Sequence, residues 1–380
     1  MQLYDVSPCV AAVGERTEIT IRPLYAHVSF PDEIYKVKVV GMDDKTCDEY
    51  DVRVTDGNIS FSLLCAREQE YSIILDDGRR FCVYAVEDDL LDRIPLKGDL
   101  HLHSFCSDGA QSPAFVIASA RKIGMDFAAI TDHRRYQPSL DAIEAFRGFD
   151  TDMLIVPGEE VHPPYVPVHI INFGGSFSVN SLFDEKYAAE VARIAEEIPD
   201  EGIDRSCYAA CKWCFDKIEE GGGISLFCHP LWVTEGAYNV DAEMTDYMLA
   251  HKPFTAFELL GGHEQESNNL QVAYYNQKRA EGMRIPIVGV SDAHGCCETS
   301  EYFGWTYTIA FAYENTLPAI KESVKNFYTV AVEQMPGESP HVYGEFRLVK
   351  YARFLLREYF PAHDEQCRRE GMMMFEHISR

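Results

Sequence analysis

The chain of 380 residues lacks several features that would assign a protein to a class at once. No apolar run is long enough to cross a bilayer, so we expect no membrane partner. The first residues contain no basic region followed by an apolar core, so we expect no secretory signal and a cytoplasmic location. The 12 cysteines show no compact spacing framework. Without an export signal, we expect thiols instead of disulfides.

Basic residues are also scarce. The 34 lysines and arginines face 61 aspartates and glutamates, which gives a formal net charge of −27. The acidic residues are scattered along the chain, and a field of this sign repels polyanions. Nucleic acid is therefore not an expected partner unless bound cations reverse the local sign. A small phosphorylated molecule fits better, and assembly into a homo-oligomer stays open.

The hydrophobic patterning divides the chain into three parts. Residues 1–94 read as short strands with Asp-Gly turn signals at 56–57 and 77–78, which predicts a small antiparallel β-sandwich. Residues 97–335 alternate strands with amphipathic helices, which predicts an α/β domain with a mostly parallel sheet that could close into a barrel. Residues 340–380 read as a helical extension. The N-terminal part is expected to be a structural or oligomerisation domain.

The segment KGDLHLHSFCSDG, residues 97–109, concentrates side chains that bind metals. Alternate side chains of an extended strand share a face, so Asp99, His101 and His103 are expected to point the same way. Asp108 lies in a polar turn just beyond and could return toward the same point. A His-x-His pair alone is usually incidental. Together with the histidines found elsewhere, this segment predicts a metal site.

Further metal-ligand side chains fall at the C-terminal ends of successive predicted strands. In α/β barrels, the loops at that end meet at the barrel mouth. Six of the 13 histidines share this placement, which incidental core histidines would not do. The set is His101, His103, Asp108, Asp132, His133, Glu160, His169, His229, Asp292 and His294. It exceeds the needs of one tetrahedral zinc and predicts two or three divalent ions, zinc, manganese or iron, that share a bridging carboxylate.

The motifs HLHSFCSDG, ITDH, GEE, VHI, CHP and SDAH, in this order, resemble those of the PHP (polymerase and histidinol phosphatase) family of metal-dependent phosphoesterases. The likeness covers residues 97–335 and excludes the N-terminal β-region and the C-terminal helix. The resemblance implies a distorted (β/α)7 barrel of the PHP type with a trinuclear metal site.

The resemblance also implies three ligand sets, carried over position by position. The first ion would be held by His101, His103, Glu160 and Asp292. The second would be held by Asp108, His133 and His294, and the third by Glu160, His169 and His229. Whether Glu159 or Glu160 bridges the ions stays open, although the family's Gly-x-Glu pattern favours Glu160.

Three further polar residues, together with Asp132 from the set above, are candidates for substrate contact or catalysis. Arg134 and Arg135 follow the Thr-Asp-His motif, and guanidinium groups there would suit phosphate oxygens, the alternative being a solvated pair on a loop. Asp132 is predicted to be catalytic, as a partner that orients a neighbouring group. His263 follows the strand FTAFELL and is a candidate proton donor or substrate contact.

The spacing of Cys207, Cys211 and Cys214 matches the C-x3-C-x2-C pattern of iron–sulfur radical enzymes. Here the three cysteines recur at i, i+4 and i+7 of an amphipathic segment. This spacing is typical of one buried helical face, which is the interpretation we favour.

These observations predict a metal-dependent hydrolase that cleaves a phosphate monoester or diester of a small metabolite by metal-activated water. One alternative is an amidohydrolase-like enzyme acting on an amide or lactone, but no predicted strand end carries the lysine that would form a bridging carbamate. The other alternative is a non-catalytic binding protein in which metals serve only stability.

Overall fold

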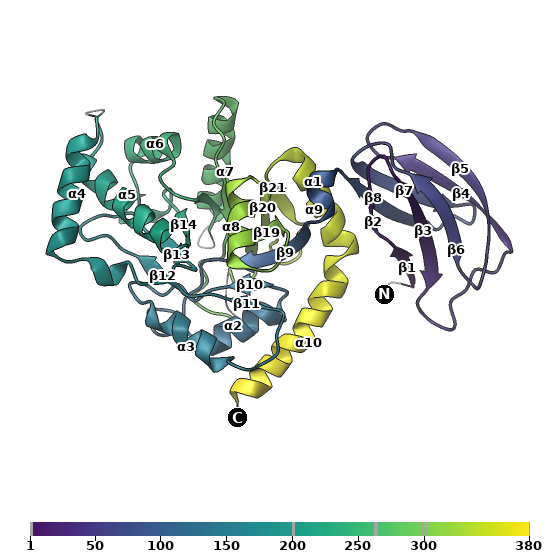
Figure 1. The fold of residues 1–380 in the computed structure, drawn as a ribbon, viewed down its shortest axis with the longest axis horizontal. Helices are drawn as coiled ribbons and strands as arrows, with labels where there is room; N and C mark the ends of the chain where they lie inside the picture. The colour runs from purple at the N-terminus through teal and green to yellow at the C-terminus, as the bar shows by residue number, and fades with distance from the viewer. Residues whose placement is uncertain (1–2, 200–201, 262–264, 298–299, 301, 380) are drawn as a thin grey trace. The chain divides into compact units, whose positions relative to one another are not determined.

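The computed structural model describes residues 3–199, 202–261, 265–297, 300 and 302–379, and its chain contacts form two compact units (Figure 1). Unit 1 comprises Met1–Arg93 and Lys350–Tyr359, and unit 2 comprises Ile94–Val349 and Phe360–Arg380. The extension predicted over residues 340–380 is thus divided between the units. In the described ranges, no helix is long and apolar enough to cross a membrane.

Unit 1 contains two sheets of short strands. Their elements are β1 (Tyr4–Ser7), β2 (Val10–Ala12), β3 (Arg16–Pro23), β4 (Ile34–Gly41), β5 (Cys47–Arg53), β6 (Ile59–Leu64), β7 (Gln69–Leu75), β8 (Arg80–Val86) and the short helix α1 (Asp88–Leu91). One sheet has the order β1-β3-β6 and the other β2-β8-β7-β4-β5, with only β2 and β8 parallel. Buried residues of both sheets, such as Ile19 and Ile73, belong to one hydrophobic cluster.

The two Asp-Gly turns have different outcomes. Gly78 adopts a positive φ of 89° between β7 and β8, which pair as an antiparallel hairpin as predicted. Asp56 and Gly57 also have positive φ values and form a tight turn between Thr55 and Asn58. However, β5 and β6 on either side of this turn belong to different sheets.

Unit 2 alternates strands and helices along most of its length. In chain order, its elements are β9 (Ile94–Asp99), α2 (Pro113–Lys122), β10 (Phe127–Ala128), α3 (Gln137–Ala145), β11 (Leu154–Ile155), β12 (Gly158–Val161), β13 (Ile170–Phe173), η1 (Asn180–Leu182), α4 (Glu185–Glu197), α5 (Arg205–Glu220), β14 (Ile224–Phe227), β15 (Val233–Thr234), β16 (Ala237–Tyr238), α6 (Ala242–His251), β17 (Ala256–Leu260), α7 (Gln265–Ala280), β18 (Ile287–Gly289), β19 (Thr306–Ala312), α8 (Leu317–Lys325), β20 (Thr329–Glu333), β21 (His341–Tyr343) and α10 (Phe360–Ile378). Helix α9 (Phe346–Glu358) spans the division between the units.

Most strands of unit 2 form two mixed sheets, with the orders β11-β10-β9-β19-β20-β21 and β12-β13-β14-β17-β18, and β15 and β16 form a separate antiparallel pair. The prediction of an α/β fold is confirmed, whereas the closed (β/α)7 barrel and the sandwich remain predictions. The prediction of a mostly parallel sheet is wrong, because β13 and β19 run antiparallel to both of their neighbours. A helical connection does not dictate strand direction: α8 joins β19 to β20, and these strands pair antiparallel.

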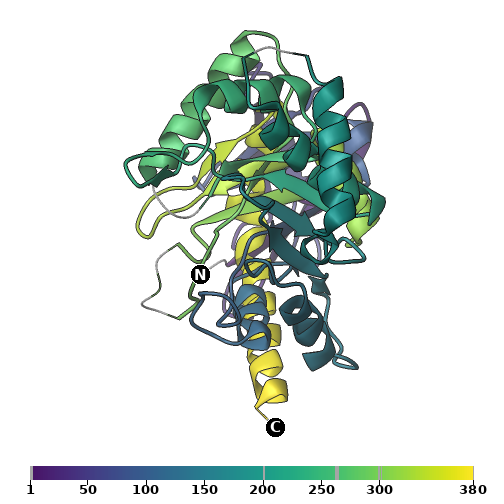
Figure 2. The same cartoon turned by 90° about the vertical axis from the view of Figure 1, so that its left-hand side faces the viewer.

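Helices cover the strands of unit 2, and α2 and α10 show how they are fixed. The Ser112 side chain caps α2 by accepting a hydrogen bond from the Phe115 amide, and Pro113 occupies the first turn. Arg121 of α2 binds Asp126 at 2.8 Å and Glu370 of α10 at 2.7 Å. Figure 2 shows α10, in yellow, running beside α2. These contacts hold the helices against the sheet whose loops carry the polar cluster described next.

Candidate metal centre

His101 and His103 lie in the loop just after β9, not within a longer strand. Strand β9 ends at Asp99, whose carboxylate turns to accept hydrogen bonds from the backbone N–H groups of His101 and Ser291. Asp99 therefore does not join the two histidines, contrary to the strand-face prediction. The two imidazoles nevertheless converge, because their Nε2 atoms lie 3.1 Å and 2.9 Å from the same Oδ1 atom of Asp292.

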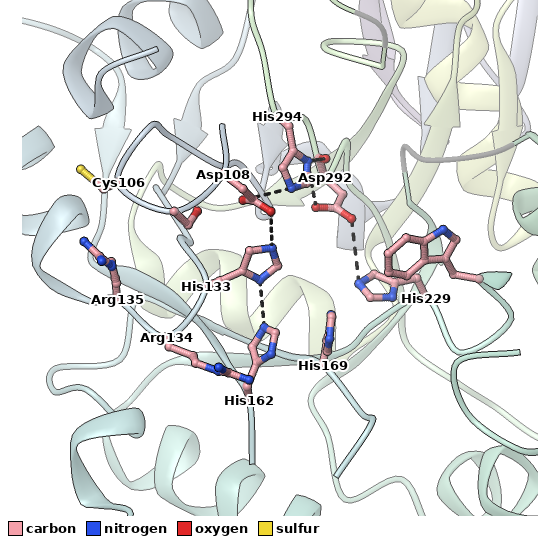
Figure 3. Close-up of a pocket in the computed structure, with 12 residues that line it drawn as sticks. Cys106, Asp108, His133, Arg134, Arg135, His162, His169, His229, Asp292 and His294 are labelled. Atoms are coloured by element: carbon pink, nitrogen blue, oxygen red, sulfur yellow. Dashed lines mark hydrogen bonds and ion pairs between the residues drawn. The ribbon is translucent and has the colours of Figure 1, made fainter. Parts of the chain in front are cut away.

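Asp108, His133 and His294 form a second group at the more open side of the cluster. The Asp108 carboxylate lies 3.2 Å from Nε2 of His133 and 3.3 Å from Nε2 of His294. Figure 3 shows Asp108 between the two imidazoles. The Asp108 turn is fixed by the Gly109 amide, which donates to the Ser104 carbonyl oxygen at 2.8 Å. This group is the one that the resemblance assigns to the second ion.

Glu160 in β12 lies at the centre of the cluster. Its Oε2 atom is 2.5 Å from Nδ1 of His133, and its Oε1 atom is 2.7 Å from Nδ1 of His169. Nε2 of His101 and of His103 lie 3.6 Å and 3.5 Å from Oε2. One buried carboxylate thus faces histidines from several segments of the chain, which is the position that a bridging ligand would occupy.

Glu159 points away from these histidines. Its carboxylate accepts hydrogen bonds from the Ser178 hydroxyl at 2.8 Å and from the side-chain amides of Asn172 and Asn180 at 3.3 Å and 2.9 Å. Adjacent residues of a strand face opposite sides, so only one of the two glutamates can reach the cluster. The geometry places Glu160 in that role.

His169 and His229 complete the predicted ligand set from neighbouring strands. His229 follows β14, and its Nε2 atom lies 3.9 Å from both Glu160 and Asp292. His169 precedes β13, so the prediction that it lies at the C-terminal end of a strand is wrong. Because β13 runs antiparallel to β12 and β14, its first residue reaches the same edge as their last residues.

The charge states of Glu160 and His229 suit metal ligation. Burial alone would raise the pKa of Glu160, but the surrounding histidines, His169 foremost, hold that pKa well below its usual value. Glu160 is therefore a carboxylate. Burial lowers the pKa of His229 to about 3, so this imidazole is neutral and retains a lone pair for a metal. For His101 and His133, burial alone would lower the pKa but the neighbouring carboxylates raise it, so a proton held there must leave before the imidazole binds a metal.

Several buried atoms that could bind a metal make no hydrogen bond of normal geometry within the described residues, although other side chains of the cluster lie close to them, and a cation would satisfy them. They are Nε2 of His101, Nε2 of His103 and both carboxylate oxygens of Glu160. Buried polar atoms are rarely left unsatisfied, because each costs free energy. Nitrogen and carboxylate oxygen at this spacing are also the ligands that zinc, manganese and iron use. The residues present therefore fit a metal centre.

Asp132 is fully engaged in hydrogen bonds behind the Ser104–Asp108 turn. Its buried carboxylate accepts from the Ser104 amide at 2.7 Å, from the Ser104 hydroxyl at 2.6 Å and from the Ser107 hydroxyl at 2.7 Å. Asp132 therefore positions the loop that carries Asp108, in line with the orienting part of the role predicted for it, and its part in catalysis stays a prediction. The other predicted catalytic residue, His263, lies outside the described residues.

Two residues of the cluster were not among the predicted ligands. His162 lies two residues beyond Glu160, and its Nε2 atom is 2.9 Å from Nδ1 of His133. The alternation of β12 could have indicated it, since residues i and i+2 share a face. Glu258 is fully buried in β17, where Oε2 lies 3.0 Å from Nδ1 of His101. A single charged residue inside the apolar strand AFELL was the available signal.

A cavity of about 900 Å³ opens over the cluster. Its lining includes both predicted substrate-binding residues, Arg134 and Arg135, together with Cys106 and Trp232. Figure 3 shows the two arginine side chains on the same side of the cavity as His162. Arg134 has a φ of +59°, and its amide donates to the Glu160 carbonyl oxygen at 2.8 Å, which fixes its backbone to the centre.

The cysteine spacing at 207–214 belongs to the long helix α5. Cys211 and Cys214 are buried in the hydrophobic cluster around this helix, and Cys207 packs against its edge. Burial raises the pKa of both buried thiols well above the ordinary value, which disfavours the thiolates that a cluster would need. The helical-face interpretation thus agrees with the structure.

Comparisons with known proteins bear on the family. No family model matches the chain. It is 35% identical over 74 residues to the DNA polymerase/3′-5′ exonuclease PolX of Bacillus subtilis (strain 168), a match that spans 20% of this chain and 13% of PolX.

Two solved structures are similar to parts of this chain. One, from Bacteroides vulgatus ATCC 8482, is described as a two-domain protein containing a predicted PHP-like metal-dependent phosphoesterase (20% identity, 70% of this chain, 71% of that chain, TM-score 0.49). The other, from Bifidobacterium adolescentis ATCC 15703, is described as a putative metal-dependent phosphoesterase (19% identity, 55% of this chain, 91% of that chain, TM-score 0.38). The description of the first structure names the class that the motifs of this chain resemble, the PHP-like metal-dependent phosphoesterases.

Proposed function

We propose that this protein is a hydrolase that cleaves a phosphate ester of a small metabolite at a centre of two or three divalent ions. The observation that carries the proposal is the convergence of imidazoles and carboxylates from separate loops around Glu160, with buried donor atoms that have no hydrogen-bond partner among the described residues. The close approaches within the cluster, such as 2.5 Å between Glu160 and His133, do not have normal hydrogen-bond geometry, whereas a shared cation would bind the same atoms.

Three groups, two of which share Glu160, would hold the ions, which we expect to be zinc, manganese or iron. They are His101, His103, Glu160 and Asp292; Asp108, His133 and His294; and Glu160, His169 and His229. Short distances from histidine nitrogens to Asp292 and Asp108 support the first two groups. In the third group, the short distance between His169 and Glu160 supports these two residues. Nε2 of His229 lies farther from Glu160, at 3.9 Å.

When bound, grouped divalent ions lower the pKa of a coordinated water and offset the charge of a phosphate. The chain's own residues supply the rest. Arg134 and Arg135 line the cavity beside the centre, where guanidinium groups can hold phosphate oxygens through paired hydrogen bonds. Asp132 fixes the loop that presents Asp108.

A small substrate is favoured over a polymer for two reasons. The net charge of −27 repels a polyanion over most of the surface. The cavity of about 900 Å³ is also within the range that binds single small molecules. The amide or lactone hydrolase is a competing outcome of the test below.

The test compares wild type with the His101→Ala/His103→Ala double variant in metal content and in hydrolysis of generic phosphate monoesters, diesters and amides with added manganese. We expect phosphate-ester hydrolysis by wild type, and loss of both metal and activity in the variant. His27→Ala, at an exposed position of unit 1, is the control. Retained phosphatase activity in the double variant, or activity on amides alone, would overturn the proposal.

A further inference from the structure

We propose that a second cavity, adjoining the metal centre, binds the alcohol part of the ester, and that this part carries an aromatic or similarly flat apolar ring. The inference rests on the proposed function, because it identifies the leaving group of the same ester. This second cavity, which we call the ring subsite, measures about 780 Å³. It shares Arg134 and His162 with the cavity over the metal centre, so the two spaces meet at these residues.

The ring subsite differs in chemistry from the metal cavity. Most of its remaining lining is apolar and conformationally restricted: Pro163, Pro164, Tyr165, Val166, Pro167 and Phe183. Proline rings and aromatic faces offer flat apolar surface that loses little entropy on binding. A phosphate group would gain little binding free energy from this apolar lining, whereas a ring attached to the phosphate would cover the lining and remove it from water.

Tyr165 is the residue that folding alone does not explain. Its side chain is fully exposed, and its backbone φ is +64°. The Val166 amide donates to the Pro163 carbonyl oxygen at 3.2 Å, so these residues form a turn with Pro164 second and Tyr165 third. A turn with proline second and a positive φ third normally has glycine or asparagine at that third position. An exposed tyrosine in this conformation fits a ligand contact better than a fold requirement.

The turn is tied to the metal centre through the backbone around Glu160. The His162 amide donates to the Asn180 side-chain oxygen at 3.2 Å, and the Asn180 side-chain amide donates to the Glu160 carbonyl oxygen at 3.1 Å. Arg134 donates its own amide to the same carbonyl oxygen. These bonds fix the entrance of the ring subsite relative to the centre. A substrate that binds with its phosphate at the metal centre would therefore place its alcohol part at a fixed position in the ring subsite.

The test uses two non-hydrolysable probes with the same head group, methylphosphonate and 2-naphthylmethylphosphonate, titrated calorimetrically into the manganese-loaded full chain. We expect wild type to bind the naphthyl probe about tenfold more tightly. Tyr165→Gly removes the ring while suiting the positive φ, so the turn is retained. In this variant the preference should fall below about threefold, with methylphosphonate affinity unchanged. Tyr313→Ala, an exposed tyrosine that lines neither cavity, should keep the preference.

Equal binding of the two probes by wild type would overturn the ring subsite and leave the proposed function intact. So would a Tyr165→Gly variant that keeps the full preference. If neither phosphonate binds the metal-loaded protein, the phosphoesterase proposal itself fails, and the subsite fails with it.

Discussion

Glu258 holds its Oε2 atom 3.0 Å from Nδ1 of His101, and both side chains are buried. On the other side of the imidazole, Nε2 points to the cluster, 3.1 Å from Asp292. A carboxylate that accepts the Nδ1 proton selects the tautomer in which Nε2 keeps its lone pair for a metal. Glu258 is therefore a positioning residue of the candidate metal centre.

Replacing this carboxylate should weaken metal binding. We expect Glu258→Gln to lower the affinity for manganese or zinc by about 10–100-fold, because the neutral amide holds the His101 proton less firmly. The affinity is measured by competition with a chelator of known strength. Glu266→Gln, an exposed position in the first turn of α7, is the matched control. An unchanged affinity in Glu258→Gln would show that His101 needs no such partner.

The neighbouring glutamates of β12 should respond in opposite ways to substitution. Glu160→Gln removes the central ligand, so the rise in Tm that metal causes in wild type should be lost. Glu159→Gln breaks hydrogen bonds to Ser178 and Asn180 and should lower the metal-free Tm while keeping the metal-induced rise. Thermal unfolding with and without manganese separates the two effects. A full metal response in Glu160→Gln would remove it from the centre.

Gly109 has a steric reason to be glycine. A Cβ atom at this position would lie 2.7 Å from the backbone carbon and oxygen of His103. Gly109→Ala should therefore displace the Asp108 turn, destabilise the fold by about 1–3 kcal/mol and weaken metal binding. Gly221→Ala is the control, since its Cβ would approach no atom closer than 3.3 Å. Chemical unfolding and chelator competition measure the two effects, and a Gly109→Ala variant unchanged in both would contradict this steric account.

The sequence predicted what depends on the order of strands and on local alternation. His101, His103 and Asp292 could be grouped from their spacing because loops at one edge of a sheet meet. Their convergence on a single carboxylate oxygen follows that expectation. The hairpin at Gly78 likewise depends on local turn chemistry, and it formed as expected.

Features that depend on strand direction and on burial could not be predicted from the sequence. His169 reaches the cluster from the start of β13, which requires knowing that β13 runs antiparallel to its neighbours. Glu258 lies inside an apolar strand, and only the packing of β17 shows which imidazole it meets. The motif indicated that Asp132 orients a neighbouring group, but only the structure shows that its carboxylate accepts hydrogen bonds from the hydroxyls of Ser104 and Ser107.

His363 of α10 contacts Asp126 at a place away from the metal centre, and this contact should make the stability of the fold depend on pH. Nε2 of His363 lies 2.8 Å from Asp126, with Asp364 and the Cys367 thiol also beside the ring. Burial alone would lower the pKa of His363, but the hydrogen bond to Asp126 and its other neighbours raise it to about 11.

Because this pKa lies above the ordinary value near 6.5, protonated His363 stabilises the fold fully below about pH 6.5. That contribution is lost as the pH rises toward 11. The free energy of unfolding of wild type should therefore exceed that of His363→Gln most at pH 6, and the difference should shrink steadily toward pH 11. Urea unfolding at intervals across this range measures it, with His27→Gln as the exposed control. A difference that stays constant with pH would mean that His363 packs against Asp126 without carrying the extra proton.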